Sequence, residues 1–109
     1  GKEIISPGQL LTHYSPKSNL RLNVLEPSKE EVYLAFGSKE DSVEGFSLSE
    51  NKILTEAARN LYNYLRLADE MILKDPNSNK KSIAVAPIPN YDLGASINDR
   101  LLRASTLKR

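Results

Sequence analysis

The chain has no cysteine, and His13 is its single histidine. The lack of cysteine excludes disulfides, thiolate metal ligands and cysteine nucleophiles. One histidine cannot form a multi-histidine metal site, and a serine hydrolase would have to rely on His13 alone. We therefore expect no metal site in this chain.

Long apolar runs and an excess of one charge are also missing. No stretch approaches the roughly 20 apolar residues that a membrane span needs, and we expect no signal peptide. The 15 Lys and Arg residues nearly balance the 14 Asp and Glu residues, for a formal net charge of +1. The overall charge gives no indication that the protein wraps nucleic acid or binds a membrane surface. We expect a cytoplasmic protein that does not contact membranes.

The sequence lacks the motifs of a self-sufficient active site. It contains neither the G-x-G-x-x-G fingerprint of dinucleotide-binding proteins nor a Walker-type Gly-Lys-Ser/Thr. Acid-base catalysis by paired carboxylates needs pKa values shifted by burial, and no Asp or Glu lies in an obviously apolar stretch. With 109 residues and a Gly in place of an initiating Met, we expect a single domain excised from a longer protein. No residue of this chain is predicted to be catalytic.

Strand and helix patterns alternate along the chain. Alternating or continuous apolar residues predict strands over 20–24, 31–36 and 82–86, with a fainter one over 45–48. A helix is predicted from a continuous apolar stripe made of Leu54, Ala57, Ala58, Leu61, Leu65, Ala68 and Ile72. It should be capped by Ser49 or Asn51 and should stop before Asp75-Pro76. A last helix begins near Leu93. This order indicates an α/β fold with parallel pairing.

The most informative segment is near the N-terminus, where Ser6-Pro7-Gly8 precedes His13-Tyr14-Ser15-Pro16-Lys17. Each proline fixes φ and removes a backbone donor, and each preceding serine is pushed toward extended geometry. A flexible linker would be rich in Gly and Ser or charged. We interpret residues 1–19 as a shaped strap, ahead of a folded body over 20–109.

Candidate ligand or interdomain positions lie where strands end, because ligands of open α/β sheets bind outside the carboxyl ends of the strands. Those ends carry Gly37 and the turn Pro87-Ile88-Pro89. A single glycine there is more often only a turn. The last helix also holds the polar run Asn98-Asp99-Arg100, for which we expect a structural role such as bracing the loop after Ala86. Helical spacing also pairs Asp99 with Arg103, and Arg66 with Asp69.

Three segments of the chain form a combined pattern. They are Ser6-Pro7-Gly8 through His13-Tyr14-Ser15-Pro16-Lys17, Leu61-Tyr62-Asn63-Tyr64-Leu65-Arg66 with Asp69, and Ile83 to Pro89 continuing into Leu93-Gly94 and Ile97-Asn98-Asp99-Arg100-Leu101. Together they resemble the C-terminal domain, with the linker before it, of the two-domain threonylcarbamoyl-AMP synthases (Sua/YciO/YrdC), and the resemblance covers about residues 5–104. Two positions depart from the usual pattern: Ser15 replaces Ala and Gln9 replaces Met.

The resemblance implies a small Rossmann-like, three-layer domain with a mostly parallel sheet flanked by helices. It also implies a partner, the N-terminal catalytic domain, which this chain lacks. In the family that domain binds ATP with magnesium and condenses ATP, threonine and bicarbonate into threonylcarbamoyl-AMP. A separate complex then uses this product to modify tRNA. The domain seen here would bind no cofactor itself and would assist or regulate catalysis.

In this family the linker crosses the mouth of the catalytic cleft. We therefore expect Ser6, Pro7, Gly8, His13, Tyr14, Pro16 and Lys17 to form a lid over the substrates. Two alternatives remain open. The domain could itself bind a nucleotide or an RNA phosphate at Gly37 and Pro87, or it could be a purely structural interaction domain.

Overall fold

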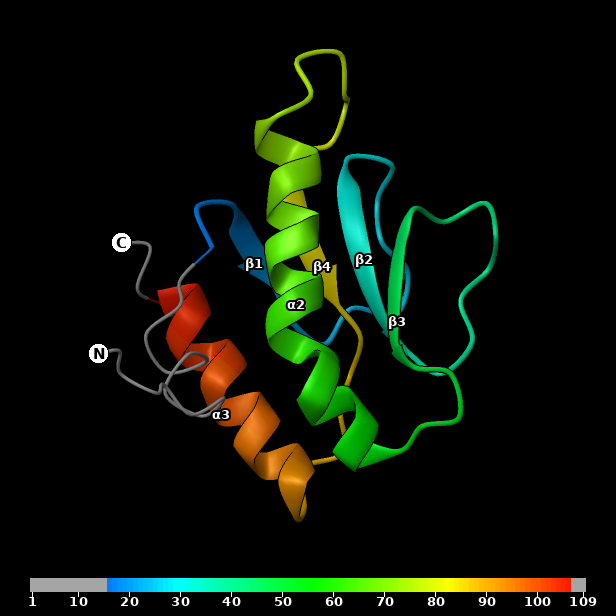
Figure 1. The fold of residues 1–109 in the computed structure, drawn as a ribbon, viewed down its shortest axis with the longest axis vertical. Coiled ribbons are helices and arrows are strands. Elements are labelled where there is room, and N and C mark those ends of the chain that lie inside the picture. Colours follow the sequence, from blue (N-terminus) through cyan, green and yellow to red (C-terminus); the bar gives the residue numbers. More distant parts are fainter. Residues whose placement is uncertain (1–15, 107–109) are drawn as a thin grey trace, which may run out of the picture.

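The computed structural model describes residues 16–106 (Figure 1), which form one parallel sheet and two long helices. Along the chain the elements are β1 (Asn19–Arg21), β2 (Glu31–Phe36), β3 (Gly45–Ser49), α2 (Leu54–Leu73), β4 (Ser82–Val85) and α3 (Leu93–Thr106). Neighbouring strands follow the order β1-β4-β2-β3, and all three pairs are parallel. The α/β fold, the parallel sheet and the faint third strand are therefore confirmed.

The two central strands are apolar because both of their faces are covered. In β2, Val32 and Leu34 are completely buried, and Ala35 on the opposite face is 3% exposed. In β4, Ile83 and Ala84 are likewise fully buried on opposite faces. Continuous apolar runs are typical of such strands in parallel sheets.

Both helices pack on one face of this sheet (Figure 1). The predicted stripe of α2 forms the contact, with Ala57, Leu61, Leu65 and Ala68 buried. From α3, Ile97 and Leu101 join the same core cluster, which also contains Leu34, Leu48 and Val85 from the sheet. As predicted, α2 ends ahead of Asp75-Pro76, at Leu73.

Ser49 organises the start of α2. Its buried hydroxyl accepts a hydrogen bond from the Ile53 amide at 2.8 Å and donates one to Glu56 Oε1 at 2.5 Å. Ile53, not Ser49 or Asn51, occupies the N-cap position, and its own side chain makes no capping bond. Ser49 therefore satisfies an amide of the helix start from four residues upstream.

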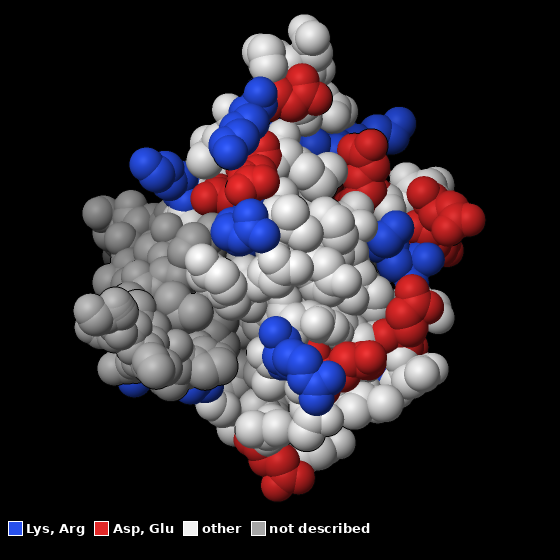
Figure 2. Space-filling view, in the orientation of Figure 1, with Lys and Arg blue, Asp and Glu red and all other residues white. Residues whose placement is uncertain are grey.

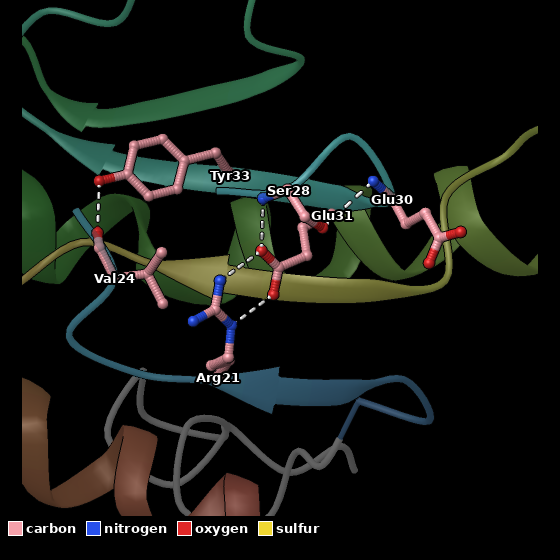
Figure 3. A network of polar contacts seen from close by, with 6 residues as sticks. All are labelled: Arg21, Val24, Ser28, Glu30, Glu31 and Tyr33. Atoms are coloured by element: carbon pink, nitrogen blue, oxygen red, sulfur yellow. Dashed lines mark hydrogen bonds and ion pairs between the residues drawn. The ribbon is translucent and has the colours of Figure 1, made fainter. Parts of the chain in front are cut away.

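Within residues 16–106 the second face of the sheet is covered by loops. The hydroxyl of Tyr33 points from this face to the carbonyl of Val24, 2.7 Å away in the loop after β1 (Figure 3). Residues of the 38–43 loop lie over the same face and line a hollow with Tyr33 and Ala35. The third layer that the resemblance implies is thus made of irregular segments in this part of the chain.

Gly45 is required where β3 begins. Its φ is +145°, and a Cβ at this position would lie 1.9 Å from the carbonyl oxygen of Tyr33 on β2. No side chain fits so close to a neighbouring backbone. The close pairing of β2 with β3 therefore depends on this glycine.

Neither described helix combines the length and the apolar character that crossing a membrane requires.

Candidate functional site

The strap joins the body of the domain at a defined anchor formed by Pro16, Lys17, Ser18 and Asp69. Asp69 lies near the C-terminal end of α2 and is 7% exposed. Its Oδ2 accepts a hydrogen bond from the Lys17 amide at 2.9 Å, and its Oδ1 accepts one from the Ser18 amide at 3.0 Å. Pro16 is among the most completely buried side chains. One carboxylate of α2 therefore holds Lys17 and Ser18, the last two residues before β1.

This geometry corrects two sequence predictions. Arg66 does not pair with Asp69; it donates to Glu70 Oε2 at 2.9 Å and to Asn63 Oδ1 at 2.8 Å. Asp69 instead turns inward to the strap. The sequence also gave no sign of a buried carboxylate, yet Asp69 and Glu31 are 7% and 6% exposed. The donors to Asp69 lie 51 and 52 residues away in the sequence, and those to Glu31 lie on the preceding strand and loop.

The other predicted strap residues, Ser6, Pro7, Gly8, His13 and Tyr14, lie outside the described residues. Of the proposed lid, the structure describes Pro16 and Lys17. Lys17 contributes its backbone to the anchor, and the residue as a whole is exposed. The role of the lid residues and the division at residue 19 stay predictions.

Glu31 holds the loop between β1 and β2. Arg21 approaches it side-on, with Nε donating to Oε2 at 2.8 Å and Nη2 donating to Oε1 at 2.9 Å (Figure 3). The Ser28 amide adds a bond to Oε1 at 2.8 Å. These donors, Arg21 first, hold the pKa of Glu31 below its usual value, against the opposing effect of burial. Every carboxylate oxygen is occupied, so Glu31 is suited to structure and not to proton transfer.

Gly37 follows β2 with φ +110°. Its amide donates to the Ser49 carbonyl at 2.8 Å, and its carbonyl accepts from Ser47 Oγ at 2.7 Å. An amide already bonded inside the sheet is not free to bind a phosphate. The geometry at Gly37 favours a turn.

Pro87 and Pro89 shape the connection from β4 to α3. Pro87 is exposed, while Ile88 between the two prolines is 5% exposed. A Cβ on Gly94 would lie 1.8 Å from the Pro89 carbonyl oxygen, so the first turn of α3 packs directly on this connection. The turn is therefore rigidly attached to the helix that follows it.

The polar run of α3 divides into separate roles. Asn98 Nδ2 donates to the Ile88 carbonyl at 3.0 Å, which is the predicted bracing of the loop after Ala86. Asp99 pairs with Arg103 at 3.0 Å on the surface, also as predicted. Arg100 donates to Ser96 within the same helix. The three side chains do not converge on one catalytic arrangement.

Among residues 16–106, the charged side chains give no sign of a polyanion-binding surface on the helix-covered face. In Figure 2, Lys and Arg alternate there with Asp and Glu around a largely uncharged centre. Within residues 16–106 no three His, Cys, Asp or Glu side chains are grouped to hold a metal ion.

A scan against protein families matches residues 1–106 to the family described as "Threonylcarbamoyl-AMP synthase, C-terminal domain". Neither the curated proteins nor the solved structures give a match. The family match includes both the strap and the body, and it agrees with the parallel α/β fold. The chain therefore belongs to the Sua/YciO/YrdC family of threonylcarbamoyl-AMP synthases, as a C-terminal domain.

Proposed function

We propose that this domain is the accessory part of an enzyme that makes threonylcarbamoyl-AMP from ATP, threonine and bicarbonate for tRNA modification. Catalysis, with ATP and magnesium, takes place in an N-terminal domain. The strap closes over that domain's substrates as a lid. Family membership supports the reaction, and the anchor at Asp69 supports the lid.

The attachment of the strap at Asp69 is the observation that best supports a lid. A lid works when closure costs little entropy and always occurs at the same place. Two backbone amides donate hydrogen bonds to one buried carboxylate, and Pro16 is buried beside them in the sequence; together they fix the point at which the strap leaves the body. A strap held at one end loses less freedom on closing than a freely jointed linker does.

Closure has a chemical purpose in this reaction. The product is a mixed anhydride, which water hydrolyses, so a lid that excludes water protects it. Tyr14 supplies a rigid ring with one hydroxyl, and the adjacent His13 supplies a second polar ring, both suited to covering a small ligand. Ser6, Pro7, Gly8 and Lys17 complete the strap around them.

The test is the Tyr14→Ala variant of the two-domain enzyme. It should raise the threonine KM or increase the fraction of intermediate lost to hydrolysis. Tyr91→Ala is a matched control, because Tyr91 is 61% exposed in the body of the domain. Unchanged kinetics and unchanged coupling in Tyr14→Ala would contradict the lid and favour a purely structural domain.

A further inference from the structure

A hollow of about 570 Å³ lies between α3 and the carboxyl ends of β1 and β4. Its apolar lining comes from Leu22, Val85, Ile88, Leu101 and Leu102. The volume falls within the range of small-molecule sites. The position, outside the carboxyl ends of parallel strands, is where α/β sheets bind ligands. It lies apart from Gly37, where the backbone groups are already bonded.

Two asparagines of the lining form a linked pair. Asn98 Nδ2 donates one hydrogen bond to the Ile88 carbonyl at 3.0 Å and another to Asn90 Oδ1 at 3.2 Å. Both amide hydrogens of Asn98 are thereby used, which fixes its orientation. Among residues 16–106, Asn98 Oδ1 and Asn90 Nδ2 have no hydrogen-bond partner. The pair thus keeps one acceptor and one donor for a ligand.

An acceptor beside a donor matches the edge of a nucleobase. An asparagine amide pairs in two places with adenine, accepting from the amino group and donating to a ring nitrogen. Here the two groups come from two linked side chains instead of one. The apolar lining, with Leu102 56% exposed, offers surface for a planar ring.

Charge in the lining selects against phosphate. No Lys or Arg is among the described residues that line the hollow, whereas Asp99 is. Arg103 partly neutralises Asp99 at 3.0 Å, yet both side chains are more than half exposed. A carboxylate repels a phosphate but accepts hydrogen bonds from sugar hydroxyls, as acidic residues do in ribose-binding sites.

We propose that this hollow binds an uncharged nucleoside. The base lies against the apolar lining and pairs with Asn90 and Asn98, and the sugar hydroxyls are bound near Asp99. This proposal does not depend on the proposed function, because every group that it uses lies within the described residues 16–106.

The test is an amide NMR titration of the ¹⁵N-labelled 109-residue chain with adenosine. Saturable shifts are expected at the side-chain amides of Asn90 and Asn98 and at the backbone amide of Leu102. N6,N6-dimethyladenosine keeps the ring but lacks the donor, so it should bind about five- to ten-fold more weakly, the effect of one lost hydrogen bond. AMP should bind no more tightly than adenosine.

Variants locate the site. Asn90→Ala removes an exposed side chain and should weaken adenosine binding about five-fold, while Leu102→Glu should abolish it. Asn51→Ala, exposed and far along the chain from the hollow, is the matched control and should bind normally. The remaining amide spectrum checks that each variant is folded. Absence of saturable shifts, equal binding of the dimethyl analogue, or tighter binding of AMP would each overturn the proposal.

Discussion

Replacing Asp69 should loosen the attachment of the strap to α2. Asp69→Ala removes two hydrogen bonds to a charged acceptor and leaves the amides of Lys17 and Ser18 without their partner. Bonds to charged groups contribute about 1.5–3 kcal/mol each. Water reaches the partly buried Lys17 amide and offsets part of that loss. We expect the free energy of unfolding to fall by about 2–4 kcal/mol.

Asp69→Asn is the milder substitution, because asparagine preserves the shape of the aspartate side chain. The amide oxygen can still accept from one backbone amide, but its NH₂ group faces the other amide donor. We expect the free energy of unfolding to fall by about 1–3 kcal/mol. Asp99→Asn is the control, since Asp99 forms an exposed pair with Arg103 and such pairs contribute about 0.2–1 kcal/mol.

Urea denaturation measures the global effect, and amide hydrogen exchange at Lys17 and Ser18 measures the local one. If the anchor opens on its own, exchange at these two amides speeds up even where the global transition moves little. The reasoning is refuted if both amides keep their protection in Asp69→Asn and its urea midpoint shifts no more than that of Asp99→Asn.

Three further substitutions test the rest of the fold. Glu31 has a lowered pKa in the folded state, so the stability that it adds is present above its ordinary pKa of about 4.5 and is lost as the pH falls through its folded pKa. Glu31→Gln should therefore flatten the loss of unfolding free energy between pH 7 and pH 3, measured by urea titrations. An unchanged dependence on pH would contradict this role of Glu31. Gly45→Ala should cost more than about 2 kcal/mol by thermal denaturation, because its Cβ would collide with β2; a near-neutral result would mean that the strands can separate. The Lys80 side chain is 9% exposed and binds Glu44 at 3.1 Å and the Lys29 carbonyl at 2.7 Å. Lys80→Ala should therefore lower the free energy of unfolding by about 1 kcal/mol, whereas Lys81→Ala, at an exposed residue, should leave it almost unchanged. Equal urea midpoints for the two variants would refute this difference.

Some side-chain contacts of the two helices could be predicted from the sequence and others could not. The run Asn98-Asp99-Arg100 predicts a bracing role, because three consecutive polar residues in a helix indicate tertiary partners, and Asn98 braces the loop after Ala86. Asp99 and Arg103 paired as their spacing indicated. Arg66 and Asp69 did not, although their spacing was equally suitable. Helical spacing lists the neighbours that a side chain can reach on its own helix, and a distant segment can compete for it.

The sequence by itself determined the elements of this protein. Periodic apolar residues fixed α2, apolar runs fixed β2 and β4, and Asp75-Pro76 marked where α2 stops, because these signals act between residues close in the chain. Only the tertiary structure decided the strand order, the burial of Glu31 and the anchor at Asp69. The amides of Lys17 and Ser18 lie 52 and 51 residues from Asp69 in the sequence. These groups meet only in the folded chain. A buried carboxylate requires hydrogen-bond donors, and in this fold the two amides lie within reach of Asp69.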